Sequence, residues 1–207
     1  MSLKTAIVRQ FGKPTSLVGK LAGHIMARRS SNRLRNQRTV ELMNLQPDSR
    51  VLEIGCGPGL ALALCAETVS EGRIIGLDHS PVMIEQARKR LEASGSESSV
   101  DLVFGGVDRL KEWPGAFDRV YSLNLIQFIA DKTDFFQRVF ATLDQGGICL
   151  TTYQPRLDNE DPNGASAMAD KVTRIMKEAG FKQVVRIGIV AGPSPALCVI
   201  GQKEVRR

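Results

Sequence analysis

The chain has 207 residues, of which 43% are hydrophobic and 24% are charged, and these proportions are typical of one ordinary globular domain. No apolar run approaches the ~18 residues that a membrane-spanning helix needs, so we expect no transmembrane anchor. Four cysteines far apart in the sequence (Cys56, Cys65, Cys149, Cys198) and two histidines lack metal-ligand spacing, so we expect no metal site.

Positive charge is concentrated at the start of the chain. Residues 1–50 hold ten Lys or Arg residues and only two acids, whereas the whole chain holds 28 and 22. Such asymmetry indicates contact with an anionic ligand, a membrane surface or nucleic acid, or simply a solvated basic helix face. An Arg-rich, acid-poor start is also found in organelle transit peptides. We expect a cytoplasmic protein, with mitochondrial import as the alternative.

Two helices are predicted before residue 48. Apolar residues recur at helical spacing over residues 17–26, with His24 and basic residues on another face. A second helical stretch covers about residues 31–45 and ends at a Pro-Asp turn. We therefore divide the chain into a basic N-terminal helical segment (1–48) and a core domain (49–207).

From residue 51 onward, strand and helix patterns alternate. Short apolar runs predict five strands: Val51–Ile54, Ile74–Leu77, Val100–Phe104, Phe117–Ser122 and Ile148–Thr152. Helical patterns follow the first, second and fourth strands: Leu60–Val69, a helix capped by Ser80 that runs through Leu91, and Lys132–Leu143. Strands connected by crossover helices form a parallel sheet.

The end of the chain breaks this rhythm. A helix with apolar residues from Met168 to Ala179 ends at Gly180, and two apolar strands follow at Val184–Val190 and Ala196–Gly201. The residues between these strands leave no room for a crossover helix, so the strands must form a hairpin. We expect an α/β fold with a Rossmann-like, doubly wound sheet of seven strands, mostly parallel with the last strand antiparallel, plus N-terminal helices.

The most informative stretch is Val51-Leu52-Glu53-Ile54-Gly55-Cys56-Gly57-Pro58-Gly59, a strand that turns on glycines into a helix. Glycine lets the chain turn sharply and lets backbone N–H groups approach a ligand. A dinucleotide fingerprint would need glycine where Leu60 stands, which disfavours NAD. Asp78 ends the next strand, where an acid can accept hydrogen bonds from both hydroxyls of a ribose. The alternative for Asp78 is stabilisation of the following helix N-terminus.

With these features, residues from about Arg50 to Lys203 resemble a class I S-adenosylmethionine-dependent methyltransferase. The first motif of that family has an acid two residues before the first glycine, as Glu53 stands before Gly55, and the terminal antiparallel strand is its sheet signature. The resemblance implies S-adenosylmethionine as cofactor. It also implies a set of cofactor-binding residues: Glu53, Gly55, Cys56, Gly57, Gly59, Asp78, His79, Met83, Val107, Asp108 and Asn124.

The resemblance also implies which part of the cofactor these residues contact. The glycine turn would hold the methionine moiety with Glu53 near its amino group, and Asp78 would bind the ribose. His79 and Met83 would flank the adenine. In Gly106-Val107-Asp108, the acid would lie near the adenine amino group, with a helix cap as the alternative.

The segment Ser122-Leu123-Asn124 would lie beside the transferred methyl. Many small-molecule members carry a histidine shortly afterwards, where this chain has Gln127-Phe128. The Asn-Pro-Pro-Tyr signature of enzymes that methylate amino groups of nucleic acids is absent, and aromatic residues for base stacking are sparse. A small molecule is therefore favoured over nucleic acid as the acceptor.

Because the sulfonium is already an activated electrophile, positioning is the main task and no nucleophile is required. A base would help an acceptor that bears a proton, and Tyr153 and His24 are the candidates. Alternatively, Tyr153 is a packed aromatic residue at a strand end and His24 is an exposed residue of its helix. The competing functions are a non-catalytic, nucleoside-binding accessory protein and an NAD-dependent oxidoreductase.

The N-terminal helices are expected to cover the acceptor pocket, with Lys20, Arg28, Arg29 or Arg33 favouring an anionic or phosphate-bearing acceptor. Deleting residues 1–30 should then abolish methyl transfer and leave cofactor affinity nearly intact. A variant of this hypothesis rests the apolar face of the first helix on a membrane, with a lipid-like or quinone-like acceptor.

Overall fold

The structure is a computed structural model, and it describes residues 30–155, 164–191 and 195–205. The helix predicted over residues 17–26, which contains His24, lies outside the described residues, as do Lys20, Arg28 and Arg29. Within the described ranges no helix has the length and apolar composition needed to cross a bilayer.

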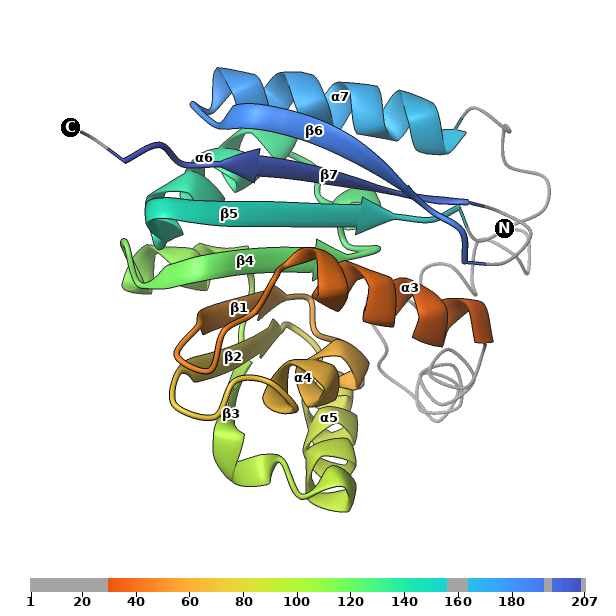
Figure 1. Cartoon of the computed structure of the whole chain (residues 1–207), viewed down its shortest axis with the longest axis vertical. Helices are drawn as coiled ribbons and strands as arrows, with labels where there is room; N and C mark the ends of the chain where they lie inside the picture. Colours follow the sequence, from red (N-terminus) through yellow and green to blue (C-terminus); the bar gives the residue numbers. More distant parts are fainter. Residues whose placement is uncertain (1–29, 156–163, 192–194, 206–207) are drawn as a thin grey trace.

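A seven-stranded sheet forms the middle layer of the molecule (Figure 1). Its strands are β1 (Arg50–Ile54), β2 (Arg73–Asp78), β3 (Val100–Phe104), β4 (Phe117–Leu123), β5 (Leu143–Tyr153), β6 (Lys182–Ile189) and β7 (Ala196–Gln202). Their order is β3-β2-β1-β4-β5-β7-β6. The first five strands pair in parallel, and β7 is antiparallel to both β5 and β6. The predicted fold, including the terminal hairpin, is confirmed.

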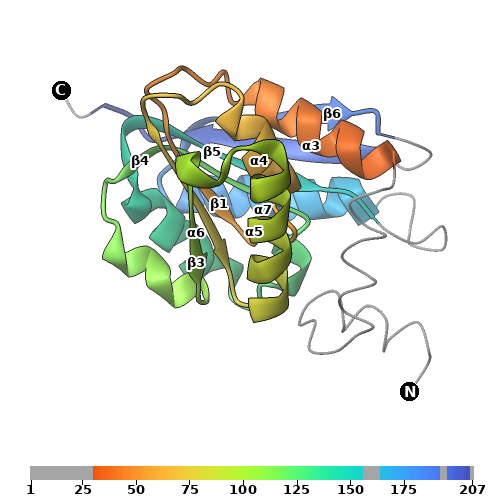
Figure 2. The same cartoon turned by 90° about the horizontal axis from the view of Figure 1, so that it is seen from below.

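Helices cover both faces of the sheet: α3 (Ser30–Leu42), α4 (Leu60–Ala66), α5 (Pro81–Ser94), α6 (Lys132–Thr142) and α7 (Gly164–Glu178). Figures 1 and 2 show α3, α4 and α5 on one face and α6 and α7 on the other. The buried apolar residues divide in the same way, since Val51 belongs to one core cluster and its neighbour Leu52 to the other. This follows from the alternation of side chains along a strand.

Several element boundaries differ from the predictions by a few residues. Helix α4 ends at Ala66, before the predicted Val69, and β5 starts at Leu143, before the predicted Ile148. The early start of β5 arises because Leu143, which is fully buried, pairs with Phe117 of β4, and the register then shifts before Arg119 pairs with Ile148.

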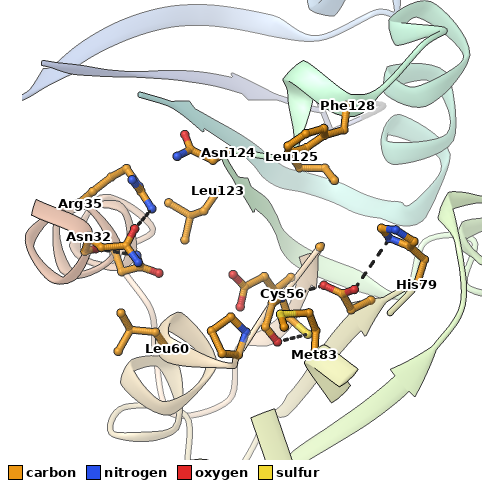
Figure 3. A pocket seen from close by; sticks show the side chains of 16 residues that line it. Asn32, Arg35, Cys56, Leu60, His79, Met83, Leu123, Asn124, Leu125 and Phe128 are labelled. Carbon is orange, nitrogen blue, oxygen red and sulfur yellow. Dashed lines mark hydrogen bonds and ion pairs between the residues drawn. The ribbon is translucent and has the colours of Figure 1, made fainter. Parts of the chain in front are cut away.

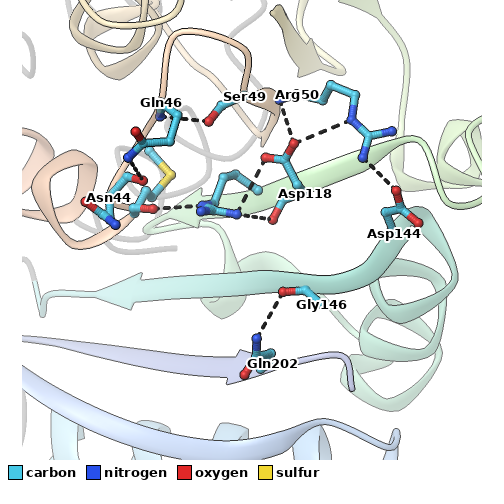
Figure 4. A network of polar contacts seen from close by, with 10 residues as sticks. Asn44, Gln46, Ser49, Arg50, Asp118, Asp144, Gly146 and Gln202 are labelled. Carbon is cyan, nitrogen blue, oxygen red and sulfur yellow. Dashed lines mark hydrogen bonds and ion pairs between the residues drawn. The ribbon is translucent and has the colours of Figure 1, made fainter. Parts of the chain in front are cut away.

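Ion pairs join the amino ends of β1, β4 and β5 (Figure 4). Asp118 accepts hydrogen bonds from the backbone N of Arg50 at 3.0 Å, and the Arg50 guanidinium also pairs with Asp144 at 2.7 Å. Arg119 donates from Nε to the carbonyl of Met43 at 2.8 Å. Since Met43 directly follows α3, this contact fastens the end of that helix to the sheet.

Candidate functional site

A pocket opens at the carboxyl ends of β1, β2 and β4 (Figure 3). The strand order reverses direction between β1 and β4, and ligands of open α/β sheets bind at such a switch point. The floor of the pocket is the glycine turn after β1, and residues after β2 and β4 form its walls. The amino-terminal part of α3 contributes a further wall.

The glycine turn after β1 has a backbone that only glycine adopts readily. Gly55, Gly57 and Gly59 have φ values of +73°, +53° and +74°. A Cβ on Gly57 would have no atom within 4 Å, so this residue faces the open pocket. A Cβ on Gly59 would lie 3.0 Å from the Cβ of Ala87, so this glycine allows α4 to pack on α5. Gly57 therefore leaves room for a ligand, whereas Gly59 allows two helices to pack closely.

Asp78 connects the glycine turn to the start of α5. Its carboxylate accepts hydrogen bonds from the backbone N of Gly57 at 2.8 Å and of Ser80 at 2.9 Å. Burial raises the pKa of Asp78 above its ordinary value, and these N–H groups oppose the shift. Ser80 caps α5 as predicted, accepting from Met83 N at 3.4 Å. Asp78 therefore stabilises the turn and presents an acid to the pocket at the same time.

Glu53 lies beneath the turn with a partner that the sequence analysis did not identify. The β1–β4 register places Tyr121 beside Glu53, and the Tyr121 hydroxyl donates to its carboxylate at 3.0 Å. The Glu53 side chain lines the pocket although the residue is only 2% exposed. Burial raises the pKa of Glu53 well above its ordinary value, the Tyr121 bond opposes this, and the charge of Asp78 adds to it.

We expect Glu53→Gln to stabilise the ligand-free protein at neutral pH. Because the pKa of Glu53 is higher in the folded state, the unfolded chain loses its proton first, and stability falls as pH rises above the ordinary glutamate pKa. Glutamine removes this loss and can still accept the Tyr121 bond. The gain should be about 1 kcal/mol, or about 2–4 °C in Tm, at pH 8 and should vanish near pH 4.

Thermal unfolding at both pH values measures this difference, and Glu92→Gln on the exposed surface of α5 is the matched control. A Glu53→Gln protein that is no more stable than wild type at pH 8 would contradict the cost we assign to the buried carboxylate.

Asn124 presents a hydrogen-bond donor to the pocket. It follows β4 with a φ of +52°, is 3% exposed, and accepts at Oδ1 from Gln154 N at 2.8 Å. This bond fixes the orientation of the amide, and among the described residues Nδ2 has no hydrogen-bond partner. A buried polar group without a partner is costly, so its position in the pocket wall indicates a ligand atom as its partner.

The remaining predicted residues divide between the pocket and other positions. His79, Met83 and Cys56 line the pocket. Val107 and Asp108 do not: they lie in a short 3-10 turn after β3, where Asp108 is exposed. Tyr153 does not line the pocket either, because its side chain packs into the core on the α6–α7 side of the sheet. The roles of Asp108 near the adenine and of Tyr153 as a base stay predictions.

Helix α3 brings residues to the pocket that the sequence analysis missed. Asn32, Arg35 and Asn36 line it, whereas Arg33, the one predicted anion-binding arginine that the structure describes, is exposed. The buried positions of α3 are the polar residues Arg35, Asn36 and Thr39. A helix that buries polar residues has no apolar stripe, so periodicity could not identify its inner face. After β4, Leu125 and Phe128 complete the wall.

Comparisons with known proteins find similarity to methyltransferases. A family model described as a methyltransferase domain matches residues 51–147. The uncharacterized methyltransferase YdaC of Bacillus subtilis is 26% identical over 164 residues, which cover 79% of this chain and 87% of that protein. The 18S rRNA (guanine-N(7))-methyltransferase bud23 of Schizosaccharomyces pombe is 31% identical over 135 residues, which cover 59% of this chain and 48% of that protein.

A solved structure has the same fold. It is a SAM-dependent methyltransferase from Aquifex aeolicus, with a TM-score of 0.74 and 14% identity, covering 88% of this chain and 97% of that one. Together, the fold and these matches support a class I S-adenosylmethionine-dependent methyltransferase with S-adenosylmethionine as its cofactor. The resemblance seen in the glycine turn and the terminal hairpin is thus confirmed. Other matching relatives are named for small-molecule acceptors, so the family does not determine the acceptor.

Proposed function

We propose that this methyltransferase acts on a small-molecule acceptor, anionic or lipid-like, at the end of β4. The observation that carries the proposal is the Nδ2 of Asn124, which has no hydrogen-bond partner within the described part of the chain and lies beside the apolar side chains of Leu125 and Phe128. One directed donor in an apolar wall suits a small acceptor with one hydrogen-bonding oxygen. Among the described lining residues the basic and aromatic side chains are few, namely Arg35, His79 and Phe128, whereas a polynucleotide is held by rows of such groups.

The pocket fits the cofactor in its chemistry. Gly57 leaves open space where a Cβ would otherwise stand, Asp78 offers an acid to the ribose, and Glu53 offers one to the methionine amino group. His79 and Met83 would flank the adenine. S-adenosylmethionine supplies a methyl group on a positively charged sulfur, which is already activated for transfer.

The protein therefore contributes position rather than a nucleophile. Asn124 would hold an acceptor oxygen by donating from Nδ2, and Leu125 and Phe128 would exclude water around it. Orientation of this kind lowers a barrier by roughly 7–11 kcal/mol in favourable cases. If the acceptor must lose a proton, His24 in the N-terminal segment remains our candidate base.

Methyl-labelled S-adenosylmethionine tests the acceptor class. The protein is incubated separately with total RNA and with an RNA-free, protein-free small-molecule extract from cells. We expect label to appear in the extract and not in the RNA. Transfer to RNA alone would overturn the proposal and would place this chain functionally beside its rRNA-methylating relative.

We also propose that residues 1–48 cover the acceptor pocket and that the protein works in the cytoplasm. Deleting residues 1–29 leaves α3 in place, and we expect it to reduce methyl transfer to the small-molecule extract at least about tenfold. The affinity for S-adenosylhomocysteine, measured by calorimetry, should change less than about twofold. Unchanged turnover in the truncated protein would show that the N-terminal segment does not cover the acceptor pocket.

Co-sedimentation of the full-length protein with anionic vesicles, lost in the same truncation, would favour the lipid-like acceptor.

A further inference from the structure

Tyr121 is a fully buried tyrosine whose hydroxyl contacts Glu53, an acid of the pocket lining. It lies on β4, which pairs in parallel with β1 in the middle of the sheet and puts the two residues side by side. Helix α4 lies over this face of the sheet (Figures 1 and 2) and brings Cys65 to the same hydroxyl. The Tyr121 oxygen is 3.0 Å from the Glu53 carboxylate and 3.4 Å from Sγ of Cys65.

The hydrogen bonds of this cluster have one favourable direction. The Tyr121 hydroxyl has a single hydrogen, which it donates to Glu53, so the Cys65 thiol must be the donor in its own contact with the hydroxyl oxygen. If Glu53 were protonated and donated to Tyr121, the hydroxyl would have to turn its hydrogen to the Cys65 sulfur, which is a weak acceptor. The geometry therefore favours an ionised Glu53, because a charged acceptor receives the stronger bond.

Glu53 is the member of this cluster that can change its charge. Burial raises the pKa of Cys65 to about 12 and the pKa of Tyr121 well above its ordinary value, so both groups keep their hydrogens. Burial also raises the pKa of Glu53, and the charge of Asp78 on β2 adds to this, whereas the Tyr121 bond lowers it. The other titratable or charged side chains of the described pocket lining are Cys56, His79 and Arg35. Tyr121 thus opposes the loss of charge that burial favours at Glu53.

We propose that Tyr121 is a positioning residue for cofactor binding, whose hydroxyl keeps the Glu53 carboxylate ionised so that it can receive the ammonium group of the methionine moiety. The inference rests on the proposed position of the cofactor, with its ammonium near Glu53. An ammonium is attracted to a carboxylate and not to a neutral carboxyl group, so a protonated Glu53 must release its proton to the solvent when the cofactor binds. Tyr121 makes this release easier and thereby maintains affinity as pH falls.

The test compares the wild-type protein with Tyr121→Phe, which removes the hydroxyl and keeps the ring. Calorimetry measures the affinity of both proteins for S-adenosylhomocysteine from pH 5 to pH 9. A hydrogen bond to a charged group corresponds to about one to two pH units. We therefore expect the ratio of wild-type to variant affinity to approach one toward pH 9 and to rise to about 10- to 100-fold at pH 5. Ionisation of the ligand itself is common to both proteins and cancels in this ratio.

Two controls separate the hydrogen bond from a general effect on the core. The nucleoside 5′-methylthioadenosine keeps the ribose and lacks the ammonium, so its affinity ratio should not change with pH. In a Glu53→Gln background no carboxyl group titrates at this position. Adding Tyr121→Phe to that background should therefore give a ratio for S-adenosylhomocysteine that is the same at every pH.

The outcomes separate this inference from the proposal on which it rests. A ratio for S-adenosylhomocysteine that stays constant from pH 5 to pH 9 would overturn the role of Tyr121, and a uniformly weaker variant would indicate damage to the core. An equal pH dependence with 5′-methylthioadenosine would also overturn it, since that ligand has no group for Glu53. If Glu53→Gln leaves the affinity for S-adenosylhomocysteine unchanged at every pH, the proposed position of the ammonium near Glu53 is itself wrong.

Discussion

Replacement of Gly57 by alanine is expected to weaken binding of S-adenosylhomocysteine about a hundredfold and to leave the protein folded. A Cβ at this position would meet no atom of the protein within 4 Å and would extend into the pocket where the methionine moiety is proposed to lie. Overpacking a filled site by a methyl group costs about 1–3 kcal/mol. The φ of +53° adds a strain of about 1–2 kcal/mol, which a folded domain tolerates.

Gly59→Ala is the matched control for this prediction. Its φ of +74° imposes similar strain, but the added Cβ would lie 3.0 Å from the Cβ and 3.1 Å from the Cα of Ala87 in α5. We expect a fall in Tm of several degrees beyond that of Gly57→Ala. Thermal unfolding and calorimetry on both proteins test the pair. Wild-type affinity in Gly57→Ala would show that the cofactor does not pass over the turn.

Replacement of Asp78 by alanine should weaken S-adenosylhomocysteine binding by about 100- to 1000-fold. The substitution removes the proposed acceptor of the ribose hydroxyls and also the partner of Gly57 N and Ser80 N. Each hydrogen bond to a charged group contributes about 1.5–3 kcal/mol, so two lost ribose bonds amount to about 3–6 kcal/mol, and the lower part of this range corresponds to the expected factor. Asp78→Asn, which keeps one oxygen acceptor, should lose only about tenfold.

A second ligand, 5′-methylthioadenosine, shows which end of the pocket is affected. This nucleoside keeps the ribose and lacks the amino acid, so Asp78→Ala should weaken it as strongly as it weakens S-adenosylhomocysteine. Retention of 5′-methylthioadenosine binding in Asp78→Ala would refute the ribose assignment, and circular dichroism of each variant checks that α5 remains folded.

Local features of the sequence predicted most of the fold. Strand and helix patterns alternate with their own periods, and the glycine spacing, with Leu60 in place of a further glycine, separates this family from dinucleotide-binding proteins. The hairpin of β6 and β7 followed from a connection too short for a crossover helix. Asp78 was found because strand ends and glycine turns meet at one edge of a parallel sheet. All of these signals lie within short stretches of chain.

The site also contains pairs that no local signal could identify. Glu53 and Tyr121 are 68 residues apart and meet because β1 and β4 are neighbours in the sheet. Arg35 and Gln154 are 119 residues apart. The same packing puts Tyr153 in the core cluster on the α6–α7 side of the sheet, which its position at a strand end did not indicate.

What the sequence by itself determined is therefore the class of protein, its sheet and the turn that receives the cofactor, because periodicity, glycine spacing and connection length act over a few residues. The tertiary structure alone decided which polar side chains of α3 are buried and which donors face the pocket. A polar helix can bury any of its faces, and only its contacts with β5 and the sheet select the one that carries Arg35.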